Sequence, residues 1–130
     1  MSMQTAVARS IALLKWSYGI ALVVIGLDKA LQINLITFWP KYISPLAHTV
    51  IPVSDFIFTA VLGTAEVVVG ILLLFFWTRY MAYVVIVVLA IIAVDLIDLG
   101  LYDIAARDVL LALGALVLSW LVQAEESARV

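Results

Sequence analysis

Four long apolar stretches determine what this chain of 130 residues can fold into. Each stretch has about the 20 residues that an α-helix needs to cross the hydrocarbon core of a bilayer. Hydrophobic residues make up 67% of the sequence and charged residues 12%, whereas soluble domains have roughly 45–50% and 25%. We therefore predict one all-α integral membrane domain, a bundle of four transmembrane helices over residues 11–29, 54–77, 80–99 and 104–122.

The outer loop at residues 31–53 is the long connection that this arrangement leaves. Apolar side chains at positions 43, 46, 47, 50 and 51 recur at the spacing of one helical face, and Pro52 follows them. Trp39 and Tyr42 are rings of the kind that lies at headgroup level. The pattern predicts a short amphipathic helix that lies in the membrane interface over the bundle. An ordered loop with some apolar contacts is the alternative.

The residue inventory excludes several kinds of chemistry. The chain has no cysteine, and its single histidine, His48, lies outside the four predicted spans. Its own residues therefore offer neither thiolate ligands nor a bis-histidine haem site, and we predict no metal site and no intrinsic cofactor. No basic patch indicates nucleic-acid binding.

The placement of lysine and arginine favours cytoplasmic termini by a small margin. With the N-terminus inside, four basic residues fall on the cytoplasmic side and three on the outer side, the latter being Lys29, Lys41 and Arg107. We therefore expect a multi-pass protein whose N- and C-termini both lie in the cytoplasm.

Glu66 is the only ionisable side chain from Phe56 to Trp77. A carboxylate at this depth is expensive in lipid, so it is expected to face a partner, a cavity or a proton path. Gly63 and Gly70 share its helical face, and small residues let helix backbones approach closely. A matching stripe of glycines lies on the first span, so we expect the first two spans to face the interior of the bundle with Glu66 pointing inward.

In this topology most of the remaining charges gather at the outer end of the bundle. They form a polar vestibule above Glu66, with Lys29 or Arg107 as its candidate cationic partner and Asp95 as a second carboxylate flanked by apolar turns. Asp98 and Asp108 are expected at solvated helix ends. Aromatic side chains that could flank an apolar ring site are Trp39, Tyr42 and Trp77. Glu66 and its cation could handle protons, or they could simply fix the packing of the helices.

Three segments resemble the DoxX-like family of membrane proteins. They read YGIALVVIGLDKAL (residues 18–31), GTAEVVVGILLLFFWTRYMA (63–82) and RDVLLALGALVLSW (107–120). The resemblance implies a four-helix membrane fold with family-like positions at Gly26, Lys29, Glu66, Gly70, Arg79 and Arg107. The chain departs from the family pattern at residues 75–77, where Phe-Phe-Trp replaces a usual glycine, and in its C-terminal tail.

The resemblance also implies a function. Members are associated with quinone-linked sulfur oxidation, as membrane subunits of a thiosulfate:quinone oxidoreductase, and others with oxidative-stress complexes, maturation or chaperone roles. We expect a subunit of a redox assembly in a prokaryotic plasma membrane, in contact with lipid and with other subunits, which handles a quinone or protons through Glu66. The chain has no self-contained catalytic centre, so the electron donor would belong to a partner. A non-catalytic accessory or assembly subunit is the alternative, and a small transporter is a further one.

Overall fold

The computed structural model of the chain describes residues 1–129, which form helices and no strand. In chain order the elements are α1 (Met3–Ala30), the 3₁₀ turn η1 (Trp39–Tyr42), α2 (Pro45–Val50), α3 (Asp55–Phe75), α4 (Thr78–Asp98) and α5 (Tyr102–Ala128). Helices α1, α3, α4 and α5 are long and apolar enough to cross a membrane. The prediction of an all-helical fold with four such helices is confirmed.

Two of the long helices extend beyond their predicted bounds. Helix α1 begins at Met3 because Ser2 caps it, its hydroxyl oxygen accepting a hydrogen bond from the Thr5 amide at 3.1 Å. Helix α5 continues to Ala128, and its last turns carry an ion pair between Arg129 and Glu125, 2.7 Å apart. The predicted bounds followed the apolar blocks, whereas a helix continues into polar turns as long as its end groups are satisfied.

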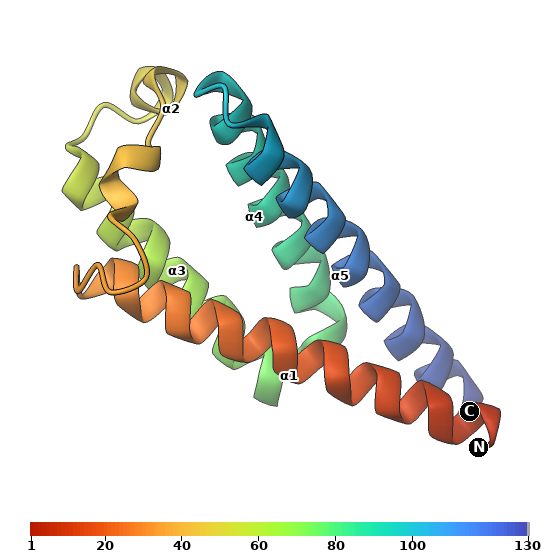
Figure 1. Ribbon diagram of the computed structural model, residues 1–130. Coiled ribbons are helices and arrows are strands. Elements are labelled where there is room, and N and C mark those ends of the chain that lie inside the picture. Colours follow the sequence, from red (N-terminus) through yellow and green to blue (C-terminus); the bar gives the residue numbers. More distant parts are fainter. Residues whose placement is uncertain (130) are drawn as a thin grey trace.

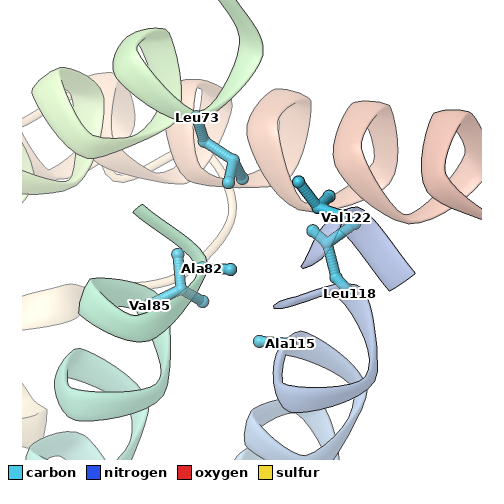
Figure 2. Close-up of a cluster of buried hydrophobic side chains, with 6 residues drawn as sticks. All are labelled: Leu73, Ala82, Val85, Ala115, Leu118 and Val122. Atoms are coloured by element: carbon cyan, nitrogen blue, oxygen red, sulfur yellow. The ribbon is translucent and has the colours of Figure 1, made fainter. Parts of the chain in front are cut away.

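The long helices form two pairs, α1 with α3 and α4 with α5 (Figure 1). The pairs meet at the end that holds both chain termini, and they diverge toward the end that holds η1 and α2 (Figure 1). Where they meet, Figure 2 shows a cluster of buried side chains contributed by α3, α4 and α5: Leu73, Ala82, Val85, Ala115, Leu118 and Val122. This cluster joins the two pairs at one end of the bundle.

Glycines set the distance between α1 and α3. A Cβ atom added at Gly63 would lie 2.6 Å from both the Gly26 carbonyl oxygen and the Ala30 amide nitrogen. At Gly26 an added Cβ would lie 2.7 Å from the Gly63 carbonyl oxygen. The two backbones therefore touch directly, without intervening side chains.

The segment of residues 31–53, which we call the outer segment, contains two short helical pieces in place of one predicted helix. Helix α2 begins at Pro45 because the Ser44 hydroxyl oxygen accepts a hydrogen bond from the Ala47 amide at 3.1 Å. Ile43, which the pattern assigned to the helix, precedes this cap in extended conformation. The apolar periodicity indicated a helical segment in this part of the chain, and the Ser44 cap determines where α2 begins. Its position in a membrane interface stays a prediction.

Candidate functional site: a cavity between the helix pairs

A cavity of about 750 Å³ lies between the two helix pairs, on the side where they diverge. All four long helices line it, together with the outer segment. Its walls are mainly aliphatic, and sites for small organic ligands typically have volumes of about 300–1,000 Å³. Along α1 the lining runs from Leu14 to Lys29, which corresponds to about 22 Å at the helical rise of about 1.5 Å per residue. The cavity is therefore long enough for a ring with an apolar tail.

An ion pair between Lys29 and Glu66 lies in the wall of this cavity. The Lys29 ammonium nitrogen is 2.8 Å from Glu66 Oε1, and the two side chains are 9% and 5% exposed. The second carboxylate oxygen, Glu66 Oε2, is buried and accepts no hydrogen bond from the described residues. The predicted cationic partner of Glu66 is thus identified as Lys29.

Trp39 covers the ammonium group of Lys29 and is itself held by Asp28. The ammonium nitrogen lies 4.6 Å from the centroid of the indole ring, within the range of a cation–π contact. The indole nitrogen donates a hydrogen bond to Asp28 Oδ2 at 2.6 Å. Asp28 also accepts hydrogen bonds from the amides of Leu35 and Ile36, at 2.8 and 3.2 Å. Asp28 therefore positions the ring that shields the ion pair.

The middle of the outer segment is attached to α4. Asp95 Oδ1 accepts a hydrogen bond from the Ser44 amide at 2.9 Å, and Asp98 Oδ2 accepts one from the Leu46 amide at 3.2 Å. The outer segment is thus anchored to α1 by one carboxylate and to α4 by two. Because Tyr42, Ile43 and Ala47 also line the cavity, this segment forms its outer wall.

Asp108 on α5 is a further carboxylate in the cavity wall, whereas the sequence suggested a solvated helix end. It is half-buried and lies close enough to Lys29 and Glu66 for direct Coulombic interaction with both. Its neighbour Arg107 is exposed and lies outside the cavity lining. Of these two neighbouring residues of α5, it is therefore the carboxylate that faces the cavity.

Two aromatic side chains lie differently from the sequence interpretation. Trp77 belongs to the turn between α3 and α4, where it is 56% exposed and packs against Phe76 at the end of the bundle remote from Glu66. Trp77 therefore does not flank a ring site in the cavity, and it lies outside the helix that carries Glu66, because α3 ends at Phe75. Tyr18, which sequence reasoning did not single out, lines the cavity, and its hydroxyl donates a hydrogen bond from α1 to the Leu111 carbonyl on α5.

Replacing Asp28 by asparagine is expected to loosen the outer segment. The amide side chain of Asp28→Asn keeps one acceptor oxygen and presents an NH₂ group to donors that now meet a carboxylate. We expect hydrogen exchange at the Leu35 and Ile36 amides to become about tenfold faster, because one charge-assisted hydrogen bond is lost. Hydrogen-exchange mass spectrometry measures these rates. The Ala47 amide, which Ser44 caps, serves as the internal control. Unchanged exchange at Leu35 and Ile36 would contradict the anchoring role of Asp28.

The site as a whole combines a long apolar cavity with a shielded ion pair, two further carboxylates and an outer wall held by aspartate side chains. Such an arrangement can bind an amphipathic molecule and present a carboxylate oxygen to its polar end. In comparisons with known proteins, no family model, no curated protein and no solved structure matches the chain.

Proposed function

We propose that this chain is a multi-pass membrane protein that binds a quinone-class compound in its cavity, as a subunit of a larger redox assembly. The observation that carries the proposal is the position of the Lys29–Glu66 ion pair in the wall of a mainly apolar cavity about 22 Å long. A quinone has a polar ring and an apolar tail, which match the charged and aliphatic parts of this cavity. Buried ionisable groups in membrane helices commonly mark ligand or proton pathways.

Glu66 is the group through which the proposed site handles protons. Lys29 holds Glu66 Oε1 in place and is itself covered by Trp39, whereas Oε2 accepts no hydrogen bond from the described residues. Because Oε2 is buried, the Glu66 side chain has to turn toward the cavity to accept a hydrogen bond from a ligand hydroxyl. The electron donor belongs to another subunit in this function, because the chain has no cysteine and only one histidine, too few side chains of these types to hold a redox metal. It also places both termini, which lie at the same end of the bundle, on the cytoplasmic side of a prokaryotic plasma membrane. The relationship to DoxX-like proteins stays a prediction from the sequence.

A specific observation favours a second candidate, a non-catalytic accessory subunit in which the ion pair only fixes helix packing. A Cβ atom at Gly63 would lie 2.5 Å from Lys29 Cβ, so Lys29 emerges from a point where the backbones of α1 and α3 are in contact. Glu66 is three residues from Gly63 on the same helix. The ion pair therefore joins the two helices where their backbones touch. In this candidate, Glu66→Gln would weaken packing and leave a neighbouring enzyme's turnover unchanged.

Filling the cavity tests the proposed binding directly. Val88 on α4 lines the cavity, whereas the adjacent Val87 points away from it and is 56% exposed. We expect Val88→Phe to weaken binding of a short-tailed benzoquinone at least about tenfold, because the added ring occupies ligand volume, and Val87→Phe to leave binding unchanged. Equilibrium dialysis of the detergent-purified protein measures both. Equal affinity in the two variants would contradict binding in this cavity.

A further inference from the structure

We infer that the cavity binds the reduced, hydroxyl-bearing quinol in preference to the oxidised quinone. The inference rests on the proposed function and adds to it the redox form of the ligand. It follows from the balance between hydrogen-bond acceptors and donors in the cavity wall.

Three carboxylates in the wall supply acceptors. They belong to Glu66, Asp95 and Asp108, which come from three different helices. Ionised carboxylates accept hydrogen bonds and cannot donate them. Asp108 is half-buried in the cavity wall and accepts no hydrogen bond from the described residues, so it has capacity for a donor on a ligand. Glu66 Oε2 also has no donor among the described residues, but it is buried and reaches a ligand only when the side chain turns toward the cavity.

The donors of the wall are mostly engaged within the protein. The Trp39 indole nitrogen donates to Asp28, and the Tyr18 hydroxyl donates to the Leu111 carbonyl. The ammonium group of Lys29 donates to Glu66 and lies over the indole ring. The Thr59 hydroxyl donates to the Asp55 carbonyl. The remaining hydroxyls of the lining, on Ser17, Thr37 and Tyr42, can donate or accept and so do not discriminate.

The charge balance of the cavity wall also favours the quinol over the quinone. One ammonium group faces three carboxylates, and Arg107 lies outside the lining. A ligand that brings carbonyl oxygens or a negative charge meets unpaired carboxylate oxygens, whereas a ligand that brings hydroxyl groups satisfies them. A quinol carries two hydroxyl groups where the quinone carries two carbonyl oxygens. The wall is therefore complementary to the quinol, and it disfavours anionic ligands such as oxyanions of sulfur.

The experiment compares the two redox forms of one ligand. A short-tailed benzoquinol and the benzoquinone of the same ring are dialysed under argon against the 130-residue protein in detergent. One hydrogen bond to a charged acceptor corresponds to about tenfold in affinity, so we expect the quinol to bind about tenfold more tightly. For a two-electron couple this raises the midpoint potential of the bound ligand by about 30 mV.

Removing one free carboxylate tests the cause of the preference. Asp108→Asn keeps the Lys29–Glu66 pair intact and replaces an obligate acceptor by a group that also donates. We expect the ratio of quinol to quinone affinity to fall severalfold toward one. Asp103→Asn, an exposed carboxylate on the same helix, is the matched control and should keep the wild-type ratio.

The outcomes separate the two proposals. Equal affinity of the wild-type protein for the two forms, or tighter binding of the quinone, would overturn the preference and leave quinone binding in place. Binding of neither form would overturn the proposed function itself. A preference that survives unchanged in both Asp108→Asn and Glu66→Gln would overturn the assignment to these carboxylates.

Discussion

Lys29→Met is expected to lower the free energy of unfolding by about 3–5 kcal/mol, because it leaves the Glu66 carboxylate buried without its partner. The double variant Lys29→Met/Glu66→Leu removes both charges and is expected to be clearly more stable than the single variant. Since a lone buried charge costs more than none, the two substitutions should show a coupling energy of at least about 1 kcal/mol in a double-mutant cycle. Unfolding by sodium dodecyl sulfate in mixed micelles, followed by circular dichroism, measures each value.

Lys41→Met provides the matched control for this cycle. Lys41 is an exposed lysine of the outer segment whose ammonium group lies 5.0 Å from the Tyr42 ring centroid, outside the ion pair. Its replacement should change stability by no more than about 0.5–1 kcal/mol. Additive losses from Lys29→Met and Glu66→Leu would contradict the pairing of the two side chains.

The fold could be predicted to a large extent because hydropathy and helical length act locally. Four apolar blocks of span length identified α1, α3, α4 and α5, and the glycine stripes identified the faces of α1 and α3 that point into the bundle. The ends of α1 and α5 could not be read in the same way. They depend on polar end groups such as the Ser2 cap, which hydropathy does not register.

The candidate site could be predicted only in part. Glu66 and Lys29 were found because a charge in an apolar helix is costly and helical geometry places both on inward stripes. The role of Asp28 depends on hydrogen bonds from amides seven and eight residues away, in a turn where Gln32 and Asn34 adopt positive φ. No periodicity encodes such contacts.

The cavity wall shows the same limit of sequence reasoning. Arg107 and Asp108 are neighbours on α5, and either could face the bundle as far as the sequence shows. The rotation of α5 against α4 decides between them, and this rotation is set by buried contacts such as those of Ala105 and Ala115. The sequence therefore indicated charged side chains at this end of the bundle. Tertiary packing determined that α5 contributes a negative charge, from Asp108, to the cavity wall.

Gly63→Ala is expected to destabilise the protein even though alanine favours the helix over glycine by about 1 kcal/mol. The added Cβ would lie 2.5 Å from Lys29 Cβ and 2.6 Å from two backbone atoms of α1, which cannot move without separating the helices. Overpacking of this kind costs about 1–3 kcal/mol or more, so we expect a net loss of stability with a weakened Lys29–Glu66 contact.

Gly70 lies seven residues further along α3 and provides the graded comparison. There an added Cβ would lie 2.9–3.1 Å from its nearest neighbours, two of which are side-chain atoms of Val23 and Leu22. Gly70→Ala should therefore cost less than Gly63→Ala, and Ala65→Val on the exposed face of α3 should change stability by no more than about 0.5–1 kcal/mol. The same unfolding measurement ranks the three variants. A Gly63→Ala protein stabilised by the intrinsic preference of alanine would mean that α1 and α3 lie further apart than backbone contact, and the ion pair would then lose the close approach that buries it.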